Sequence, residues 1–341
     1  MTKHVLSAGS TNEIVRFVEA NKDKKTCALM VKRNDKIVYA ANPNVVLPLA
    51  STVKLMVALE YSQQVAEGKI DPNEQVSIED INKYYVPDTD GGAQEHWQQF
   101  ITKKGLLQED AVSLETVARG MMMFSSNANT EYLIERLGLS EINANIKELG
   151  LPHHQELFPI VASFYIPGYL QEELHVPKRQ LMHTLQTMPQ EEYRQYAWQI
   201  HERLKKEGPL LGQRIPLLLG KQYEKVWSDR LPAASATDYI MLLERVNGDP
   251  SFPKPVRRQW TRITETSNAH HKNRFRHVGQ KNGYTPSVLT NAAYATDNDG
   301  NKTEIVFLAN ELNDTENEGL RKHLSDFTFK VFSTKTLRAT R

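Results

Sequence analysis

The sequence predicts an α+β fold: an antiparallel sheet flanked by terminal helices and built from both chain ends, with an all-helical domain inserted between them. Strand-like runs occur near the amino terminus and again after about residue 272, whereas helical periodicity dominates the sequence between them. We therefore expect residues 1–48 and 265–341 to form the α/β sheet domain and residues 49–264 the all-helical domain, with the functional site at their interface.

The amino-terminal part of the sheet domain is predicted to be a helix followed by a hairpin. The apolar residues of 11–20 lie mostly on one side of a helix, with Thr11 or Asn12 as the N-cap. Strands over 27–32 and 36–40 flank a short polar turn, which is typical of a hairpin.

The middle of the chain is predicted to be helical. The first helix begins near Ser51 and ends near Gly68, and Ser113 can cap the next. Residues 71–111 are polar and irregular, and 84–92 within them have the composition of a long surface loop. For 151–230 we expect helices and assign no chemistry. Further helices are expected over 129–137, 141–149 and 189–206, and after Ser235.

Strand patterns return toward the carboxyl terminus. They cover residues 275–278, 287–295 and 303–309, and a final helix is expected near 316–332. The apolar residues of this helix recur on one face, as expected for a helix that packs on a sheet.

The charge balance excludes several classes of partner. Forty-two Lys and Arg residues oppose 41 Asp and Glu residues, for a formal net charge of +1. We therefore expect no nucleic-acid partner and no membrane partner, and the charge leaves the oligomeric state open. The first twenty residues contain no apolar signal segment, so the sequence as given predicts a cytoplasmic protein.

Cysteine and histidine usage indicates chemistry without a metal or a cofactor. Cys27 is the single cysteine and lies in an apolar run, which favours a buried strand thiol and excludes an internal disulfide. No carboxylate or cysteine completes a ligand set with His270, His271 and His277. We therefore expect no metal site and a small-molecule substrate.

Ser51 and Lys54 are the first candidate catalytic pair. Their spacing of three residues, at the start of an apolar helical run, puts both side chains on one face of a helix. Burial disfavours the ammonium form of lysine, so a neutral Lys54 could take the proton of Ser51. The alternative is an N-cap serine followed by a lysine that reaches solvent. Ser251 and Lys254 have the same spacing, but neighbouring prolines argue against a shared helical face.

Two further motifs follow in order, Ser125-Ser126-Asn127 at a predicted helix end and Lys281-Asn282-Gly283 at the entry to a strand. Together with the Ser51 pair they resemble the signature of the SxxK serine acyltransferases, in particular class A β-lactamases and the related penicillin-binding peptidases. The resemblance covers roughly two thirds of the chain and misses 71–111 and most of 151–230. It implies a β-lactamase-like fold.

The resemblance also implies a role for each motif residue. Ser51 would form the acyl-enzyme, and Lys54 would help to deprotonate it. Ser125 would pass a proton to the leaving nitrogen, and the amide of Asn127 would hold a side-chain amide of the substrate. The structural alternative for Ser125 and Asn127 is helix capping.

The third motif would bind the substrate. Lys281 would supply positive charge to a substrate carboxylate and orient Ser125, and its structural alternative is a solvated strand residue. Asn282, Gly283 and Tyr284 would line the substrate, and the backbone N–H groups of Ser51 and Tyr284 would form the oxyanion hole.

The chain departs from the family pattern in two places. Asn282 replaces a hydroxyl residue that binds the substrate carboxylate, and Thr290 stands in a region where class A enzymes tend to carry arginine. Arg274 and Arg276 are candidate substitutes, but the pattern favours exposed arginines that flank a strand. No E-P-E-L-N-like run supplies a base for deacylation. Glu156, Glu172 and Glu173 are the candidates, of which Glu156 is best placed.

These observations predict a metal-independent serine hydrolase of the β-lactamase and penicillin-binding type, with an acyl-Ser51 intermediate on a lactam, amide or ester. One alternative is an SxxK esterase, amidase or glutaminase-like enzyme that acts on a cytoplasmic metabolite. The other is a catalytically silent homologue that binds a ligand.

Overall fold

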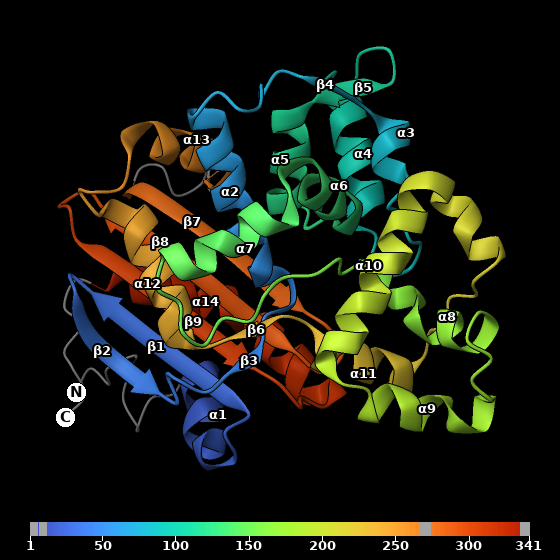
Figure 1. Ribbon diagram of the computed structural model, residues 1–341. Helices are drawn as coiled ribbons and strands as arrows, with labels where there is room; N and C mark the ends of the chain where they lie inside the picture. The colour runs from blue at the N-terminus through green and yellow to red at the C-terminus, as the bar shows by residue number, and fades with distance from the viewer. Residues whose placement is uncertain (1–5, 7–11, 266–273, 335–341) are drawn as a thin grey trace. The chain divides into compact units, whose positions relative to one another are not determined.

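The computed structural model describes residue 6 and residues 12–265 and 274–334, whose contacts group the chain into two compact units (Figure 1). The first comprises Met1–Val53, Ile146–Gln155 and Pro232–Arg341 and contains the large sheet, so we call it the sheet unit. The second, Lys54–Asn145 and Glu156–Leu231, is mostly helical and is called the helical unit. No helix in the described ranges is both long and apolar enough to cross a membrane.

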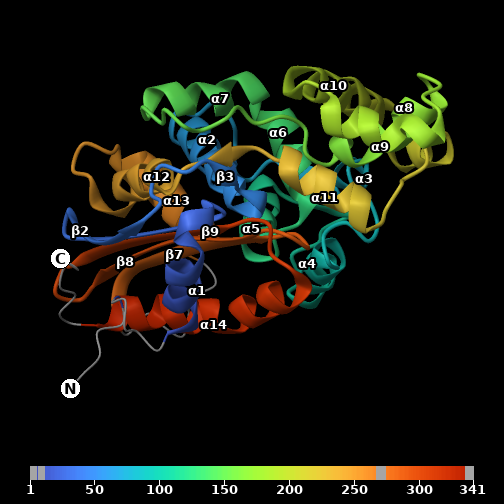
Figure 2. The same ribbon diagram turned by 90° about the horizontal axis from the view of Figure 1, so that it is seen from below.

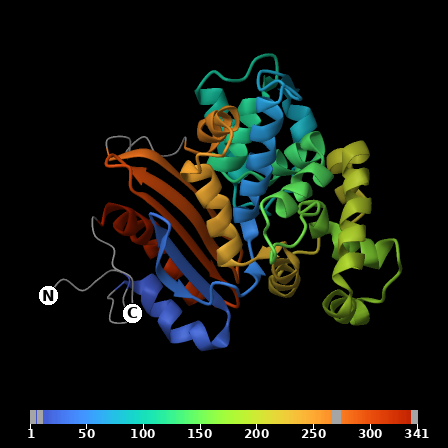
Figure 3. The ribbon, with the colours of Figure 1, turned by 60° about the vertical axis from the view of Figure 1, so that its left-hand side comes forward.

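Five antiparallel strands form the sheet, and strands from the two ends of the chain lie side by side in it, blue beside red in Figure 3. Their order is β2-β1-β9-β8-β7, so the first strand pairs with the last and β7 lies at an edge. The predicted α+β fold with a sheet built from both chain ends is thereby confirmed. The strands are β1 (Cys27–Arg33), β2 (Lys36–Ala41), β7 (Phe275–Tyr284), β8 (Leu289–Asp297) and β9 (Lys302–Ala309).

Helices cover both faces of this sheet. α1 (Glu13–Asn21) and α14 (Asp314–Ser333) lie on one face, and α12 (Ala236–Gly248) lies on the other (Figure 2). Side chains alternate between the faces of a strand. Leu29 and Phe307, which pair across β1 and β9, therefore share a core with Phe327 of α14.

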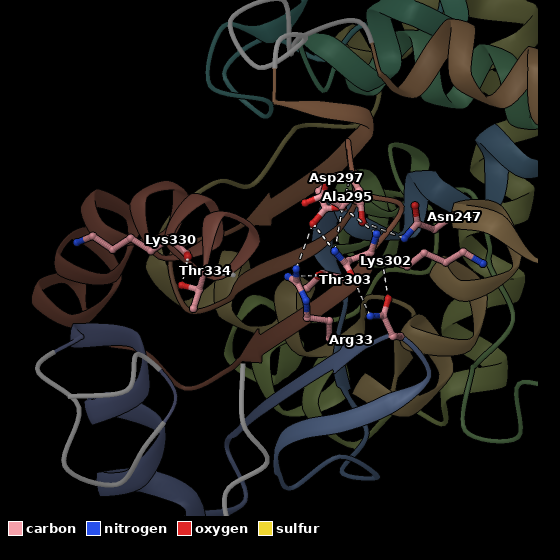
Figure 4. Close-up of polar contacts among 11 residues, drawn as sticks. Arg33, Asn247, Ala295, Asp297, Lys302, Thr303, Lys330 and Thr334 are labelled. Atoms are coloured by element: carbon pink, nitrogen blue, oxygen red, sulfur yellow. Dashed lines mark hydrogen bonds and ion pairs between the residues drawn. The ribbon is translucent and has the colours of Figure 1, made fainter. Parts of the chain in front are cut away.

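A polar cluster joins the turn that follows β1 to the turn that precedes β9 (Figure 4). Nη1 of Arg33 donates a hydrogen bond to Oγ1 of Thr303 at 3.1 Å, and Nη2 donates to the carboxylate of Asp297 at 3.2 Å. Because Arg33 is buried, these two acceptors compensate the loss of its hydration.

The sheet unit also contains one short strand, β6, and two helices, α12 and α13, from the range expected to be helical. β6 (Ala233–Ala234) pairs with β3 (Leu47–Pro48), and α13 (Lys254–Thr264) packs against β7. Nε1 of Trp260 in α13 donates to the hydroxyl of Tyr294 in β8 at 2.8 Å. Whereas we expected 49–264 to form one helical domain, contacts group α12 and α13 with the sheet because their apolar faces are buried on it.

The helical unit is organised around α6, which packs against four neighbouring helices, α2, α3, α4 and α5. Its helices are α2 (Lys54–Ala66), α3 (Ile78–Asn82), α4 (Ala93–Lys103), α5 (Leu114–Met123), α6 (Asn127–Leu137), α8 (Ile166–Glu172), α9 (Lys178–Thr187), α10 (Gln190–Glu207) and α11 (Lys221–Arg230). Two short strands, β4 (Gln75–Ser77) and β5 (Ala111–Ser113), pair with each other, and α7 (Leu139–Glu148) continues from this unit into the sheet unit.

The expectation that 71–111 is irregular is wrong for most of its length. The segment holds β4, α3 and α4, and Trp97 and Ile101 of α4 are buried, whereas residues 84–92 form the expected loop, which connects α3 to α4. Asp90 starts α4, because its carboxylate accepts hydrogen bonds from the backbone N–H groups of Ala93 and Gln94 at 3.0 and 3.1 Å. The segment is polar overall because the large apolar residues of α4, Trp97 and Ile101, recur only every fourth residue on one face of the helix.

Candidate functional site

Ser51 lies in a tight turn of the sheet unit that directly precedes α2. The turn is a 3-10 helix, Ala50–Val53, which Ala50 enters with a φ of +45°. The carbonyl oxygen of Leu49 accepts the backbone N–H of Thr52 at 3.1 Å and its hydroxyl at 2.6 Å. Ser51 is half-buried and leads into Lys54, the first residue of α2.

The edge strand β7 approaches this turn closely at Gly283. A Cβ atom on Gly283 would lie 2.5 Å from the backbone nitrogen of Ser51 and 2.8 Å from the carbonyl oxygen of Leu49. Only glycine permits that approach, since both neighbours are backbone atoms. The backbone nitrogen of Ser51 therefore lies beside the strand that contains Tyr284, as the oxyanion-hole prediction requires.

Thr290 of β8 has a structural role that the sequence did not reveal. Its buried hydroxyl donates to the carbonyl oxygen of Leu49 at 2.8 Å and contacts that of Gly283 at 3.3 Å. Thr290, which lies in a region where an arginine was expected from the family resemblance, thus links the Ser51 turn to β8 by a hydrogen bond.

A second support for this turn, from Tyr239 and His154, was also missed. The hydroxyl of Tyr239 in α12 donates to the carbonyl oxygen of Thr52 at 3.3 Å, and the imidazole of His154 stacks on the Tyr239 ring at a centroid distance of 5.7 Å. Burial lowers the pKa of His154. The imidazole is therefore neutral at pH 7 and supports the turn through packing, without introducing a charge beside Ser51.

Lys54, Ser125 and Asn127 are joined by hydrogen bonds within the helical unit. Nζ of the buried Lys54 contacts the carbonyl oxygen of Ser125 at 2.5 Å, its hydroxyl at 3.1 Å and Oδ1 of Asn127 at 2.9 Å. Ser125 has a φ of +67°, which turns the chain sharply between α5 and α6. The structure thus brings the lysine of the first motif onto the second motif.

Ser126 holds this second motif in place. Its hydroxyl caps α6 by accepting the backbone N–H of Asn129 at 3.0 Å, and it donates to Oε1 of Gln94 at 2.6 Å. The helix cap in this motif is therefore Ser126, and not Ser125 or Asn127 as the structural alternative expected; these two residues contact Lys54.

Lys281 belongs to the sheet unit and is buried, with 4% of its surface exposed. Burial lowers the pKa of Lys281 to about 7. Nζ contacts the carbonyl oxygen of Asn282 at 3.3 Å. Because side chains alternate along a strand, Lys281 shares with Gly283 the face of β7 that meets the Ser51 turn. The solvated lysine considered as the structural alternative does not describe this residue.

Asn282 and Tyr284 project from the other face of β7. Oδ1 of Asn282 accepts a hydrogen bond from Nδ2 of Asn291 at 2.7 Å. Tyr284 is 48% exposed, and the guanidinium carbon of Arg321 in α14 lies 4.1 Å from the centre of its ring. Arg321 was missed in the sequence because it lies 37 residues after Tyr284, on another element.

Arg274 and Arg276 do not reach this end of the strand. Nη2 of Arg276 donates to the carbonyl oxygen of Asn298 at 2.6 Å, and Arg274 lies over the ring of Phe329. At about 3.3 Å per residue, Arg276 is roughly 26 Å along β7 from Tyr284. Arg274 and Arg276 are therefore the exposed arginines flanking a strand that the sequence favoured, and they do not substitute for the family arginine.

Glu156 belongs to the helical unit and is exposed. The side chain has 70% of its surface accessible, and its Oε2 lies 4.0 Å from Nη1 of Arg194. Glu173 is engaged by Arg203 at 2.9 Å, and Glu172 accepts a hydrogen bond from Gln171 at 3.1 Å. None of the three is buried, so none has the desolvated setting that raises the basicity of a carboxylate.

Among the described residues, Glu135, His201 and Glu202 form a group whose ligand atoms are close enough to hold a metal ion. Nζ of Lys205 lies 2.6 Å from Glu135 and 3.5 Å from Glu202, so an ammonium group already neutralises these carboxylates. His277 contacts Glu265 at 3.3 Å, and His270 and His271 lie outside the described residues.

The comparisons with known proteins agree with this architecture. A model described as the Beta-lactamase enzyme family matches residues 10–332 of the chain. No curated protein sequence matches.

Several solved structures share the fold. A class A beta-lactamase from Bacteroides cellulosilyticus is 17% identical, with a TM-score of 0.54 over 94% of this chain and 98% of that one. A beta-lactamase from Chitinophaga pinensis is 15% identical, with a TM-score of 0.55 over 94% and 99%. A variant of PBP-A, in an acyl-enzyme complex with penicillin G, is 13% identical, with a TM-score of 0.55 over 93% and 95%. At these identities the likeness shows the fold.

Proposed function

Because the chain belongs to the beta-lactamase enzyme family, we propose that it is a serine hydrolase that forms an acyl-enzyme on Ser51 with a lactam, amide or ester substrate. The observation that supports this most is the bonding of Lys54 to Ser125 and Asn127, three residues after Ser51. An N-cap serine with a solvent-directed lysine would not produce that arrangement, since Lys54 is buried.

In the proposed acylation, Oγ of Ser51 attacks the substrate carbonyl and its proton passes to Nζ of Lys54. The backbone N–H groups of Ser51 and Tyr284 stabilise the oxyanion, which is worth about 3 to 4 kcal/mol per donor. As the carbonyl–nitrogen bond breaks, the proton moves from Lys54 through the hydroxyl of Ser125, 3.1 Å away, to the leaving nitrogen. The serine–carbonyl bond formed replaces the bond broken, and the proton is conserved.

Release of the acyl group lacks a comparable set of residues. Deacylation requires a base that activates water, and the exposed Glu156 beside Arg194 is poorly suited to that role. We therefore expect the acyl-enzyme to persist, as in a penicillin-binding protein. Nitrocefin turnover should be equal in the wild type and in Glu156→Gln. A tenfold or greater loss in the variant would instead make Glu156 the deacylating base.

The second candidate is an esterase or amidase whose substrate has no carboxylate. It is favoured by the engagement of Asn282 with Asn291 and of Thr290 with Leu49, since neither side chain is then fully available to an anionic group. A silent homologue that only binds a ligand is the third possibility.

A fluorescent penicillin and a neutral p-nitrophenyl ester separate these three functions. The proposal predicts labelling that is lost in Ser51→Ala by roughly 10³-fold or more. Ser251→Ala is the matched control, because Ser251 precedes Lys254 with the same spacing and should leave labelling unchanged. Ester hydrolysis without labelling, lost in Ser51→Ala, would identify the esterase. Ligand-induced stabilisation without either reaction would identify the silent homologue.

A further inference from the structure

His201 of α10 lies at the centre of a buried charged cluster in the helical unit. Its imidazole is fully buried, and both ring nitrogens face carboxylates of α6. Nδ1 lies 3.0 Å from Oε1 of Glu131, which is also fully buried, and Nε2 lies 3.1 Å from Oε2 of Glu135. The cluster joins α10 to α6, because His201 is 70 residues from Glu131 and 66 residues from Glu135 in the sequence.

The surroundings of the ring favour the imidazolium. A neutral imidazole has one N–H donor, whereas the imidazolium has two and can donate to both carboxylates. Burial alone would lower the pKa of His201, but the hydrogen bonds and charges of Glu131 and Glu135 outweigh it and raise the pKa. Among the described residues, Lys205 of α10 also contributes charge to the cluster, because it pairs with Glu135 at 2.6 Å and with Glu202 at 3.5 Å.

Two aromatic rings stack with the imidazole. The centroid distances are 5.4 Å to Tyr84 and 5.5 Å to Trp198, with interplanar angles of 15° and 19°. An aromatic face attracts a cation, so these rings also stabilise the charged imidazole. Because Tyr84 follows α3, the cluster connects α3, α6 and α10.

Glu131 links this cluster to the candidate catalytic residues. It lies one helical turn after Asn127 on α6, and Asn127 accepts the hydrogen bond of Lys54. Its second carboxylate oxygen accepts the backbone N–H of Val161 at 3.2 Å. Glu131 thus holds the start of α6 against the segment that precedes the 3-10 helix Ala162–Tyr165, and His201 supplies the charge that makes the buried carboxylate tolerable.

We propose that the His201 imidazolium is a positioning residue for the Ser125–Asn127 motif, which it holds in register through Glu131. The predicted effect on acylation rests on the proposed function. The predicted effect on the position of α6 rests only on the contacts of Glu131. When His201 loses its proton, Glu131 becomes an uncompensated buried charge, and the start of α6 moves away from Lys54.

The sign of the pH dependence follows from the raised pKa. The stabilising contribution of His201 is fully present below about pH 6.5, the ordinary pKa of histidine, and is lost as the pH rises through the higher pKa of the folded protein. The rate of acylation should therefore fall on the alkaline side at the pKa of His201.

Three variants of the full chain test this. His201→Gln removes the cation and leaves Glu131 charged, Glu131→Gln with His201→Gln removes both charges, and His183→Gln changes an exposed histidine of α9 as the matched control. Each is followed by amide hydrogen exchange of the peptide that contains residues 125–131, and by single-turnover labelling with a fluorescent penicillin from pH 6 to 9.

In His201→Gln we expect the exchange protection of the 125–131 peptide to fall and labelling to slow on the order of 100-fold. The decrease in the labelling rate at alkaline pH should also disappear. The double variant should regain the protection and most of the rate, again without the decrease at alkaline pH, and His183→Gln should match the wild type. A wild type that is not labelled would refute the proposed function, and hydrogen exchange would still decide the positioning role.

Unchanged protection in His201→Gln would overturn the inference. The inference would also be overturned if His201→Gln kept the wild-type pH dependence of the labelling rate. A purely structural histidine would change stability and leave that pH dependence unchanged. A neutral His201 ring at pH 7, measured by the nitrogen chemical shifts of the imidazole, would overturn it independently of any activity.

Discussion

Lys281 and Arg321 differ in how their charges depend on pH. Burial lowers the pKa of Lys281 to about 7, so only about half of the molecules carry this charge at neutral pH. Arg321 is exposed, lies on the ring of Tyr284 and stays protonated throughout the physiological range. The permanent cation at this end of β7 is therefore the arginine.

This difference predicts the effect of Arg321→Ala on an anionic probe. With Arg321 in place, the loss of charge from Lys281 between pH 6 and 8 should add little to the pH dependence of labelling by a penicillin. In Arg321→Ala we expect labelling to weaken by about tenfold, the value of one hydrogen bond to a charged group, and to fall further as the pH rises through 7 and Lys281 discharges.

Lys322→Ala is the control, because it removes the same charge from the next position of α14. The neutral ester should react equally with both variants. An Arg321→Ala protein that is labelled at the wild-type rate at pH 8 would show that Arg321 does not contact the carboxylate.

At the level of single residues, sequence motifs predicted Ser51, Lys54, Ser125 and Asn127, and the structure bonds the last three together. Their catalytic roles stay predictions. The supporting residues could not be found in the same way, because Tyr239, Thr290 and His201 act through contacts that only the fold creates. Each of these residue types is also common in an ordinary core.

At the scale of elements, α12 and β9 meet at a buried carboxylate. Glu304 of β9 is 2% exposed, and Nδ2 of Asn247 in α12 donates to its carboxylate at 2.5 Å. Nδ2 also donates to the carbonyl oxygen of Ala295 at 3.3 Å (Figure 4). Burial raises the pKa of Glu304 to about 7. The carboxyl is thus largely protonated in the folded protein at pH 6, whereas it is ionised in the unfolded chain.

Glu304→Gln should therefore stabilise the protein above pH 7. As the pH rises from about 4.5, the ordinary glutamate pKa, to 7, the unfolded carboxyl ionises and the folded one stays largely protonated. The free energy of unfolding therefore falls by about 3 kcal/mol over this range. Glutamine keeps the acceptor for Asn247 and removes that loss.

Urea unfolding at pH 5 and pH 8 measures this effect. The free-energy difference between Glu304→Gln and wild type should grow toward pH 8 in favour of the variant, whereas the exposed Glu311→Gln should show no such growth. An equal difference at both pH values would mean that Glu304 is ionised in the folded protein.

Elements with a strong hydrophobic pattern were predicted well. β1 and β9 are nearly continuous buried runs, and the apolar stripe of α14 matches the sheet beneath it. The helix α4 was not predicted, because it buries few side chains and Asp90, which accepts its first N–H groups, lies in a stretch rich in turn residues. Amphipathic helices of that kind are stabilised by their neighbours more than by their own sequence.

At the scale of the whole molecule, the sheet unit and the helical unit each contain part of the motif set. Ser51, Lys281 and Tyr284 belong to the sheet unit, whereas Lys54, Ser125 and Asn127 belong to the helical unit. The chain passes from one unit to the other between Val53 and Lys54, within the first motif. The residues of the proposed reaction are therefore divided between the two units.

The order of strands and helices along the chain allowed the fold to be predicted from sequence. The strands near the two ends of the chain are too few to form separate sheets, so one shared sheet with a helical insertion between them was expected. The division of the helices could not be predicted. α12 and α13 have the same periodicity as helices of the helical unit, and only their packing partners distinguish them.

The central claim is that Ser51 is acylated, and mass spectrometry of the protein after reaction with penicillin tests it most directly. The account predicts one added penicilloyl group per chain, located by peptide mapping on the fragment that contains Ser51 and still present after minutes. It also predicts no addition in Ser51→Ala and full addition in Ser251→Ala. Addition at another residue, or equal addition in Ser51→Ala, would contradict the account.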